Sequence, residues 1–298
     1  MASVDQDAYT KPFMLTKGMY RDVYPAVNPE NNSVEGKVVV ITGAAGGLGY
    51  GIARSWNSGK AKGIILVGRN AKGLDKAAED IVAPTKAITV PTDITSLTGC
   101  EEVFNKAVAE FGRVDALVNA AGVMTVGPIG TIDPGTWWSN FEVNLRGTYN
   151  MVHVFLKSSG GKGTIVNLVS LGASFLAPGL SGYSASKLAV IKLGECLDLE
   201  QPGIRVFSLH PGMVEAENGR GMVIDMFTPF ARDKAALTGG VTTYLAQPKA
   251  DFLKGTYLHA NWDVEEMEKH KAEITEKKLN KLAFLGAELR PGGYPWSS

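Results

Sequence analysis

The sequence predicts an α/β fold, a doubly wound parallel sheet in a single domain. Short β-branched runs alternate with amphipathic segments of ten or more residues along most of the chain. The first run, VVVI at 38–41, is apolar at every position, which is typical of a strand buried on both faces of a parallel sheet. A glycine-rich turn, TGAAGGLG at 42–49, follows it directly. Strand, turn and helix in this order require right-handed crossovers, so a Rossmann-type sheet is expected.

The remaining elements follow from the same alternation. After the glycine turn, Leu48, Ile52 and Trp56 recur at four-residue spacing and therefore share one helical face. Further strands are expected at 64–67, 87–90, 116–118, 164–166, 204–209 and 256–258. Further helices are expected at about 71–82, 97–111, 134–157 and 182–200.

We expect the chain to divide into an N-terminal extension at 1–35 and one larger domain at 36–298. The extension is polar and shows no sustained period, but Phe13, Tyr20 and Tyr24 indicate that it is anchored on the domain surface.

Composition excludes several classes of protein. Thirty basic and thirty acidic side chains cancel, so neither nucleic acid nor an anionic membrane surface is an expected partner. Cys100 and Cys196 lie far apart, and the four histidines form no metal-binding pair, so we expect neither a disulfide framework nor a metal site. No signal peptide or membrane-spanning run is apparent, which favours a cytoplasmic protein.

The glycine-rich turn is the candidate phosphate-binding site. Gly43 can adopt backbone angles that other residues avoid, and Gly47 and Gly49, on either side of Leu48, allow close approach of the backbone. The helix that begins here offers free N–H groups and a positive dipole end to a pyrophosphate. Glycine turns also serve ordinary packing, but the position after a first buried strand favours a dinucleotide.

The end of the second strand favours NADP(H) over NAD(H). An NAD site usually places an acidic residue here to bind the ribose 2′-hydroxyl, whereas this chain has Arg69 and Asn70. The Arg69 guanidinium suits a 2′-phosphate, although a solvated arginine in a turn is the alternative. Asp93 and Ile94, after the third strand, are expected to contact adenine, although Asp is also a common helix cap.

Tyr183 and Lys187 begin a long helix and are four residues apart, so they share a helical face. A phenol titrates near pH 10, too high for efficient proton exchange at neutral pH. A neighbouring ammonium favours the phenolate and is expected to lower the pKa of Tyr183. Taken alone, this spacing is common and usually structural.

The stretch from 36 to about 263 resembles the single-domain short-chain dehydrogenases/reductases. The resemblance rests on several motifs in family order: TGAAGGLG at 42–49, Asn119-Ala120-Ala121-Gly122, Asn144 in VNLRG, Ser170 in VNLVS, Tyr183 with Lys187, and Pro211-Gly212. The segment Tyr24-Pro25-Ala26 also resembles extensions of fungal members.

The resemblance implies a role for each matched residue. Tyr183 exchanges a proton with the substrate oxygen, and Ser170 holds that oxygen by a hydrogen bond. Lys187 tunes Tyr183 and binds the nicotinamide ribose, and Asn144 positions a water that links Lys187 to solvent. The implied cofactor contacts are the glycine turn, Tyr183, Lys187, Asn119, Gly122, Pro211, Gly212 and the backbone of Val214.

One departure concerns Ala216, where many members carry a threonine that contacts the nicotinamide. The resemblance also implies a substrate lid at about 215–238. This predicted lid carries Met222, Ile224, Met226, Phe227 and Phe230, and Met124 and Val126 are expected near the cleft. These residues favour a hydrophobic ketone or secondary alcohol as substrate, unless they simply pack the core. The family also implies a homodimer or homotetramer. An isomerase, lyase or cyclase, or a nucleotide-sensing protein, remains an alternative on the same scaffold.

Overall fold

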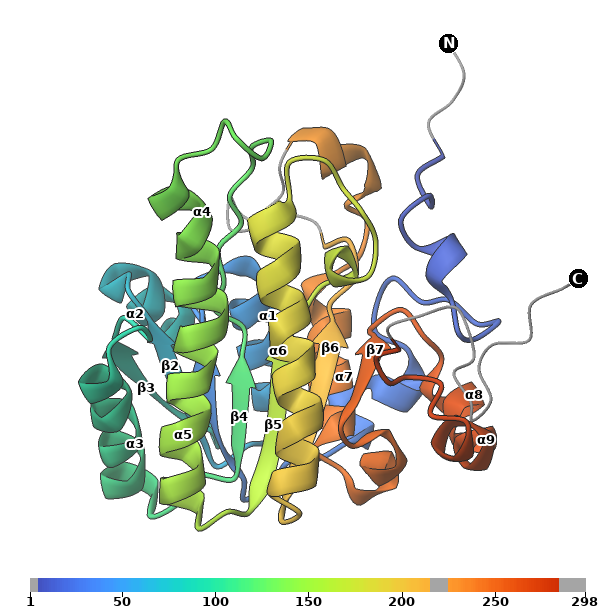
Figure 1. Cartoon of the computed structure of the whole chain (residues 1–298). Coiled ribbons are helices and arrows are strands. Elements are labelled where there is room, and N and C mark those ends of the chain that lie inside the picture. Colours follow the sequence, from blue (N-terminus) through green and yellow to red (C-terminus); the bar gives the residue numbers. More distant parts are fainter. Residues whose placement is uncertain (1–4, 215–224, 284–298) are drawn as a thin grey trace, which may run out of the picture.

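The computed structural model describes residues 5–214 and 225–283. Within them one sheet of parallel strands runs in the order β3-β2-β1-β4-β5-β6-β7 (Figure 1). The strands are β1 (Val38–Thr42), β2 (Gly63–Gly68), β3 (Lys86–Pro91), β4 (Ala116–Asn119), β5 (Gly163–Leu168), β6 (Ile204–His210) and β7 (Thr256–His259). The order reverses direction between β1 and β4, as in a doubly wound sheet. The predicted fold class is confirmed.

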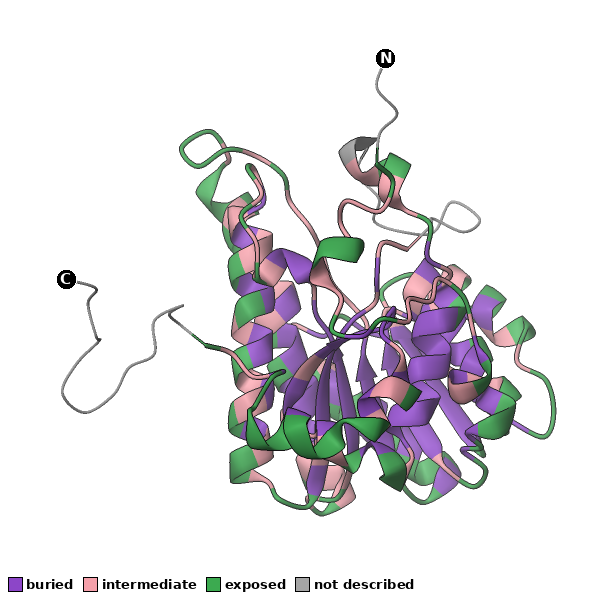
Figure 2. Cartoon of the chain, turned by 90° about the vertical axis from the view of Figure 1, so that its right-hand side faces the viewer, coloured by how far each residue is buried: buried purple, intermediate pink, exposed green. Residues whose placement is uncertain are grey.

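Helices cover both faces of the sheet, and Figure 2 shows the strands buried between them. One face carries α1 (Gly47–Ser58), α2 (Ala71–Glu79) and α7 (Ala235–Leu245). The other carries α3 (Leu97–Phe111), α5 (Thr148–Ser159) and α6 (Ser181–Glu200). The shorter helical elements are η1 (Lys11–Phe13), η2 (Pro25–Val27), η3 (Pro29–Asn31), α4 (Pro134–Asn140), η4 (Phe141–Gly147), η5 (Leu171–Ala173), η6 (Asp225–Phe230), η7 (Pro248–Leu253), α8 (Val264–Lys269) and α9 (Lys271–Glu276).

The first strand shows why its sequence is apolar throughout. Val39 and Ile41 point to the core on the α1 face, whereas Val38 and Val40 point to the core on the α3 face. All four side chains are fully buried. Side chains alternate across a strand, so a strand between two helical layers needs apolar residues at every position.

Helix α7 was not expected from the sequence, and it contains Thr238, the last residue of the predicted lid. Its sequence, AALTGGVTTYL, has two glycines and three threonines, which are weak helix formers. Close packing on α1 favours the helix here: a Cβ on Gly51 would lie 2.7 Å from the Cβ of Ala235. Trp56 of α1 also donates a hydrogen bond to Thr242 of α7, at 3.0 Å. Tertiary packing therefore overrides helix propensity.

The N-terminal extension packs on the edge of the domain near β7 and α8. Met19 forms an antiparallel bridge with Trp262. The buried phenol of Tyr24 donates to the carbonyl of Trp262 at 3.2 Å and accepts from the N–H of Val264 at 2.8 Å. Tyr20 stacks on Tyr24 with 3.5 Å between ring centroids. The aromatic residues of the extension are thus its anchors.

Candidate active site

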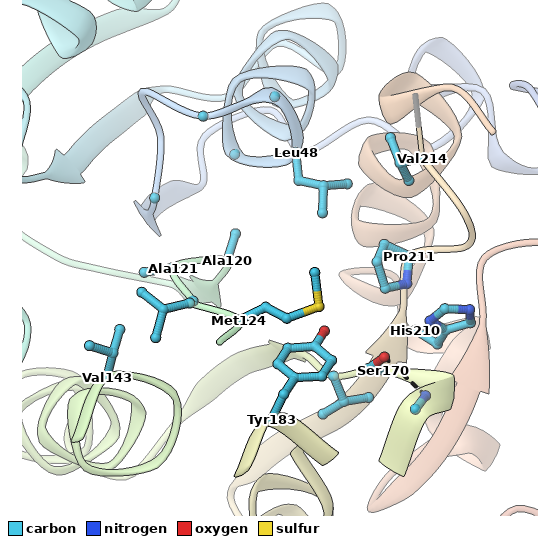
Figure 3. A pocket seen from close by; sticks show the side chains of 18 of the residues that line it. Leu48, Ala120, Ala121, Met124, Val143, Ser170, Tyr183, His210, Pro211 and Val214 are labelled. Atoms are coloured by element: carbon cyan, nitrogen blue, oxygen red, sulfur yellow. Dashed lines mark hydrogen bonds between the residues drawn. The ribbon is translucent and has the colours of Figure 1, made fainter. Parts of the chain in front are cut away.

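A cavity of about 530 Å³ lies at the carboxyl ends of the strands, the edge of a parallel sheet where ligands bind. Residues that follow β1 to β6 contribute to its wall (Figure 3). It brings together most of the residues that the sequence singled out: Gly43, Gly47, Leu48, Gly49, Arg69, Asn70, Asp93, Ile94, Gly122, Ser170, Tyr183, Pro211, Gly212 and Val214.

The glycine turn forms one wall of this cavity. Gly43 has φ +68°, and a Cβ there would lie 2.9 Å from the backbone of Ala121. A Cβ on Gly49 would lie 2.4 Å from the carbonyl oxygen of Gly43. The turn is also tied to the end of β4, because the hydroxyl of Thr42 accepts hydrogen bonds from the N–H groups of Ala120 and Ala121, both at 3.0 Å.

This wall fits the phosphates of a dinucleotide. The turn exposes backbone without bulky side chains, and α1 begins at Gly47 with its first N–H groups directed toward the cavity end of the sheet. Unpaired N–H groups and the positive end of the helix dipole favour an anionic ligand.

The predicted adenine side lies at the ends of β2 and β3. Arg69 is exposed at the rim. The side chain of Asn70 accepts from the N–H of Gly73 at 3.0 Å and so caps α2. The carboxylate of Asp93 accepts from the N–H and the hydroxyl of Thr95, both at 2.9 Å, and the backbone hydrogen bond is the largest cause of its lowered pKa. Asn70 and Asp93 therefore shape local turns as well as line the cavity.

Asn119 does not line the cavity. It is buried in β4, where its side-chain amide donates to the side chain of Asn167 in β5 at 2.9 Å. The two residues are register partners across the β4–β5 pair. The predicted cofactor contact thus lies beneath the wall, in the sheet.

Tyr183 and Ser170 present their hydroxyls to the same part of the cavity (Figure 3). Tyr183 comes from the first turn of α6, and Ser170 follows β5 and caps η5 by accepting from the N–H of Gly172 at 3.0 Å. Burial raises the pKa of Tyr183, and its hydrogen bond with Ser170 acts in the opposite direction. The two hydroxyls form a pair suited to bind one oxygen atom of a ligand.

Lys187 lies one helical turn from Tyr183, as its spacing predicts, but its electrostatic effect differs from our expectation. Its ammonium donates to the carbonyl of Leu168 at 2.8 Å and lies 6.0 Å from the centroid of the Tyr183 ring. Burial lowers the pKa of Lys187 to about 8. The pKa of Tyr183 is raised, not lowered, because desolvation of the phenolate is its largest cause.

Asn144 lies in η4, a π-helical turn between α4 and α5 that the sequence did not predict. Its side chain accepts from the N–H of Val123 at 2.8 Å and donates to the carbonyl of Val123 at 2.9 Å and to Ser186 at 3.0 Å. Asn144 and Lys187 both lie close to Gly122. A Cβ atom on Gly122 would be 3.1 Å from Asn144 Oδ1 and 3.4 Å from Lys187 Nζ. Asn144 and Lys187 are thus neighbours behind the cavity wall.

The lining residues that were not singled out from the sequence include Tyr9, Phe175 and His210. Burial lowers the pKa of His210 to about 3, and its Nδ1 accepts from the N–H of Leu171 at 3.2 Å, so a neutral ring supports the Ser170 segment. The position of His210, at the end of the sixth strand before Pro211, was a signal available in the sequence. Tyr9 and Phe175 gave none, because their contacts are long-range.

The apolar residues of the cavity wall include Met124, Leu180 and Phe227. Of the predicted lid, 215–224 lies outside the described residues, and this range includes Met222 and Ile224. Phe227 and Phe230 belong to η6. Val126 is exposed and is not part of the cavity wall.

Within residues 5–214 and 225–283, no group of three or more His, Cys, Asp or Glu side chains is arranged to hold a metal ion. In the same ranges, no helix combines the length and apolar character needed to cross a membrane.

Comparison with known proteins gives one family. The sequence model of the family described as short chain dehydrogenase matches residues 37–224. The short chain dehydrogenase mpl6 of Monascus purpureus is 32% identical over 277 residues, covering 89% of this chain and 94% of the relative. The short chain dehydrogenase andI of Emericella variicolor is 30% identical over 277 residues, covering 88% and 93%.

Solved structures agree. A dehydrogenase/reductase from Sinorhizobium meliloti 1021 has a TM-score of 0.70 and 25% identity, covering 78% of this chain and 96% of that chain. The matched family region spans the glycine turn and the Tyr183 site together. Members of the family use nicotinamide cofactors and act on small molecules that carry an alcohol or carbonyl group. This chain belongs to the short-chain dehydrogenase family.

Proposed function

We propose that this protein is an NADP(H)-dependent oxidoreductase that interconverts a ketone or aldehyde with the corresponding alcohol, and that it works as a ketoreductase on a hydrophobic small molecule. The observation that carries the proposal is the pair of hydroxyls from Tyr183 and Ser170 on the wall of a cavity that also contains the glycine turn. A proton donor and a dinucleotide cradle in one cavity are what carbonyl reduction requires.

When bound, the nicotinamide supplies or accepts the hydride. The protein's own residues bind the substrate oxygen and transfer a proton to it. Ser170 holds the substrate oxygen by a hydrogen bond, and Tyr183 donates its phenolic proton to that oxygen during reduction. Lys187 passes a proton to Tyr183, and Asn144, its neighbour behind Gly122, positions a water that links Lys187 to solvent. In the oxidative direction the proton leaves Tyr183 by the same path.

Tyr183 is in the form that can donate a proton. Burial raises the pKa of its phenol above the usual value of about 10, so the phenol carries its proton at neutral pH. A protonated phenol is the form that donates to a carbonyl oxygen during reduction.

The preference for NADP(H) is supported by the end of β2. Arg69 and Asn70 both line the cavity there, and Arg69 is exposed and free to approach a 2′-phosphate. The hydrophobic substrate is supported by Met124, Leu180 and Phe227, which also line the cavity.

The decisive experiment follows NADPH absorbance with a panel of aliphatic and aryl ketones. Consumption of NADPH with formation of the alcohol is the expected result. Binding of NADPH without consumption by any carbonyl compound would instead favour a nucleotide sensor or an isomerase, lyase or cyclase.

We also propose a homodimer or homotetramer in the cytoplasm. The exposed apolar side chains Trp138, Tyr149 and Leu188 on α4, α5 and α6 support an interface on these helices. Cys100 and Cys196 are both free thiols, which agrees with a reducing compartment. Light scattering on the purified protein tests the oligomer, and imaging of a tagged chain tests the location.

A further inference from the structure

The apolar end of the cavity carries a cluster of aromatic rings drawn from three distant segments. Tyr9 and Phe13 come from the extension, Phe175 follows η5, and Phe227 and Phe230 come from η6. Tyr9 lies at the centre: its ring centroid is 4.7 Å from Phe230, 5.3 Å from Phe227 and 5.8 Å from Phe175. The first two contacts are edge-to-face, a favourable arrangement for aromatic pairs.

Tyr9 is also part of the cavity wall, together with Phe175 and Phe227. The same cavity contains the hydroxyls of Tyr183 and Ser170. A residue of the extension therefore faces the space in which a substrate must lie, although the extension precedes the first strand of the sheet.

A chain of ion pairs holds the Tyr9 segment in place. Arg21 contacts the carboxylates of both Asp7 and Asp233, and its distance to Asp233 is 2.6 Å. Asp7 also pairs with Lys11 at 2.7 Å and with Arg232 at 3.4 Å. Two residues before Tyr9, the chain is thus fixed to the segment that follows η6.

The Arg21–Asp233 ion pair is buried, so loss of either partner would leave a buried charge without its counter-charge. The side chain of Asp233 has no exposed surface, and that of Arg21 is only 16% exposed. Asp233 also accepts from the N–H of Met213, next to Gly212, at 2.6 Å. A buried carboxylate is costly unless it is paired and hydrogen-bonded, so Arg21 must stay in place for the cavity loop to keep this form. The extension is therefore integral to the site.

We propose that Tyr9 is a specificity-determining residue of the substrate site, and that segment 5–13 forms a wall selecting carbonyl compounds with a flat aromatic ring system over small aliphatic ones. This rests on the proposed function as a ketoreductase. Tyr9, Phe175 and Phe227 offer ring faces and edges to a planar ligand, which gains from ring contacts as well as from burial. A sugar would leave its hydroxyls facing apolar rings and lose hydrogen bonds with water.

The test compares Tyr9→Ala with Tyr9→Phe, using 2-acetylnaphthalene and 3-pentanone as substrates with NADPH. The measured quantity is the ratio of kcat/KM for the aryl ketone to that for the aliphatic ketone. We expect Tyr9→Ala to lower this ratio about tenfold, the scale of one lost aromatic contact with its burial. Tyr9→Phe restores the ring and should restore the ratio. An unchanged ratio in Tyr9→Ala overturns the proposal.

Asp7→Asn tests the same idea while keeping the rings of Tyr9, Phe175 and Phe227. Loss of the ion pairs should loosen Tyr9 and lower the ratio in the same direction by a smaller factor. Lys86→Met removes an exposed ion pair with Glu110, far from the cavity, and should leave the ratio as in the parent protein. A lower ratio in Lys86→Met as well would mean that surface charge, and not the position of Tyr9, is responsible.

A binding measurement separates failure of this proposal from failure of the proposed function. If no ketone is reduced, the reductase assignment fails, yet 2-acetylnaphthalene can still be titrated calorimetrically into protein saturated with NADP⁺. About tenfold weaker binding in Tyr9→Ala than in Tyr9→Phe supports the aromatic wall. Equal affinity in the two variants contradicts it whether or not turnover is seen.

Discussion

Lys187 donates a hydrogen bond from Nζ to the main-chain carbonyl of Leu168, 2.8 Å away, behind the cavity wall. The lysine is only 6% exposed, and burial lowers its pKa to about 8. Its charge is therefore adjustable near physiological pH, unlike that of a surface lysine. A donor that can give up a proton here suits a path that resupplies Tyr183.

The depressed pKa of Lys187 predicts a pH-dependent stability. The unfolded lysine has a pKa of about 10.4. Between about pH 8 and that value the unfolded state binds a proton that the folded state lacks, so stability rises with pH. The free energy of unfolding of the parent protein, relative to Lys187→Met, should increase by about 3 kcal/mol in total across this window.

Denaturant titrations of both proteins at pH 7 and pH 10 measure this difference. The same comparison for Lys76→Met, on the exposed surface of α2, is the control and should show little change with pH. If the Lys187→Met difference were constant with pH, the amine would have an ordinary pKa in the folded protein.

Replacing Tyr183 by phenylalanine should abolish turnover while leaving the cofactor site intact. Phenylalanine keeps the ring in the cavity wall and removes only the proton donor, so kcat should fall by a factor on the order of 10³, within the range attributed to general acid catalysis. The affinity for NADPH, measured by fluorescence, should stay within about threefold, a change below 1 kcal/mol. Tyr149→Phe removes a hydroxyl from an exposed ring and is the matched control. Substantial residual turnover in Tyr183→Phe would remove the assigned role.

The elements of the fold with local sequence signals were the predictable ones. Each expected strand falls within the corresponding strand of the sheet, because short runs rich in β-branched and other apolar residues between turns have few alternatives. Helix α7 was not predicted, since its glycines and threonines become helical only by packing on α1. The π-helical turn at Asn144 was not predicted either. The spacing of apolar residues in this turn is nearly the same as in the α-helices on either side of it.

The site was predictable where a residue type has few alternative uses. The glycine turn, Ser170 and Tyr183 meet in one cavity as expected. The sequence could not show that Asn119 lies outside the cavity wall. Its position near the end of a strand does not reveal whether its side chain faces a ligand or pairs with a residue of the next strand, as it does with Asn167. Tyr9 had no signal at all, since its place depends on ion pairs between distant segments.

Gly49→Ala should damage both stability and cofactor binding. Its new Cβ would lie 2.4 Å from the carbonyl oxygen of Gly43, which belongs to backbone and cannot rotate away. Shifting this turn should lower the free energy of unfolding by about 1–3 kcal/mol, as overpacking generally does. Affinity for NADPH should fall at least about tenfold, which corresponds to about 1.4 kcal/mol. Gly135→Ala, at an exposed position of α4, should change neither quantity appreciably and controls for the substitution itself. Unaltered NADPH binding in Gly49→Ala would mean that phosphates bind elsewhere.

Arg69→Ala tests the cofactor preference. The guanidinium at the rim is proposed to pair with the 2′-phosphate, which NADPH has and NADH lacks. A charge-assisted hydrogen bond contributes about 1.5–3 kcal/mol, so the Kd for NADPH should rise more than about tenfold while the Kd for NADH changes less than about threefold. Lys72→Ala removes a nearby exposed cation from the first turn of α2 and is the control. It distinguishes a specific pair between Arg69 and the 2′-phosphate from general electrostatic attraction.

Raised ionic strength should weaken NADPH binding to the parent protein more than to Arg69→Ala, because the variant has lost the pair that salt screens. Equal losses for NADPH and NADH in Arg69→Ala would show that the arginine contacts a part common to both, such as adenine, and would leave the preference without support.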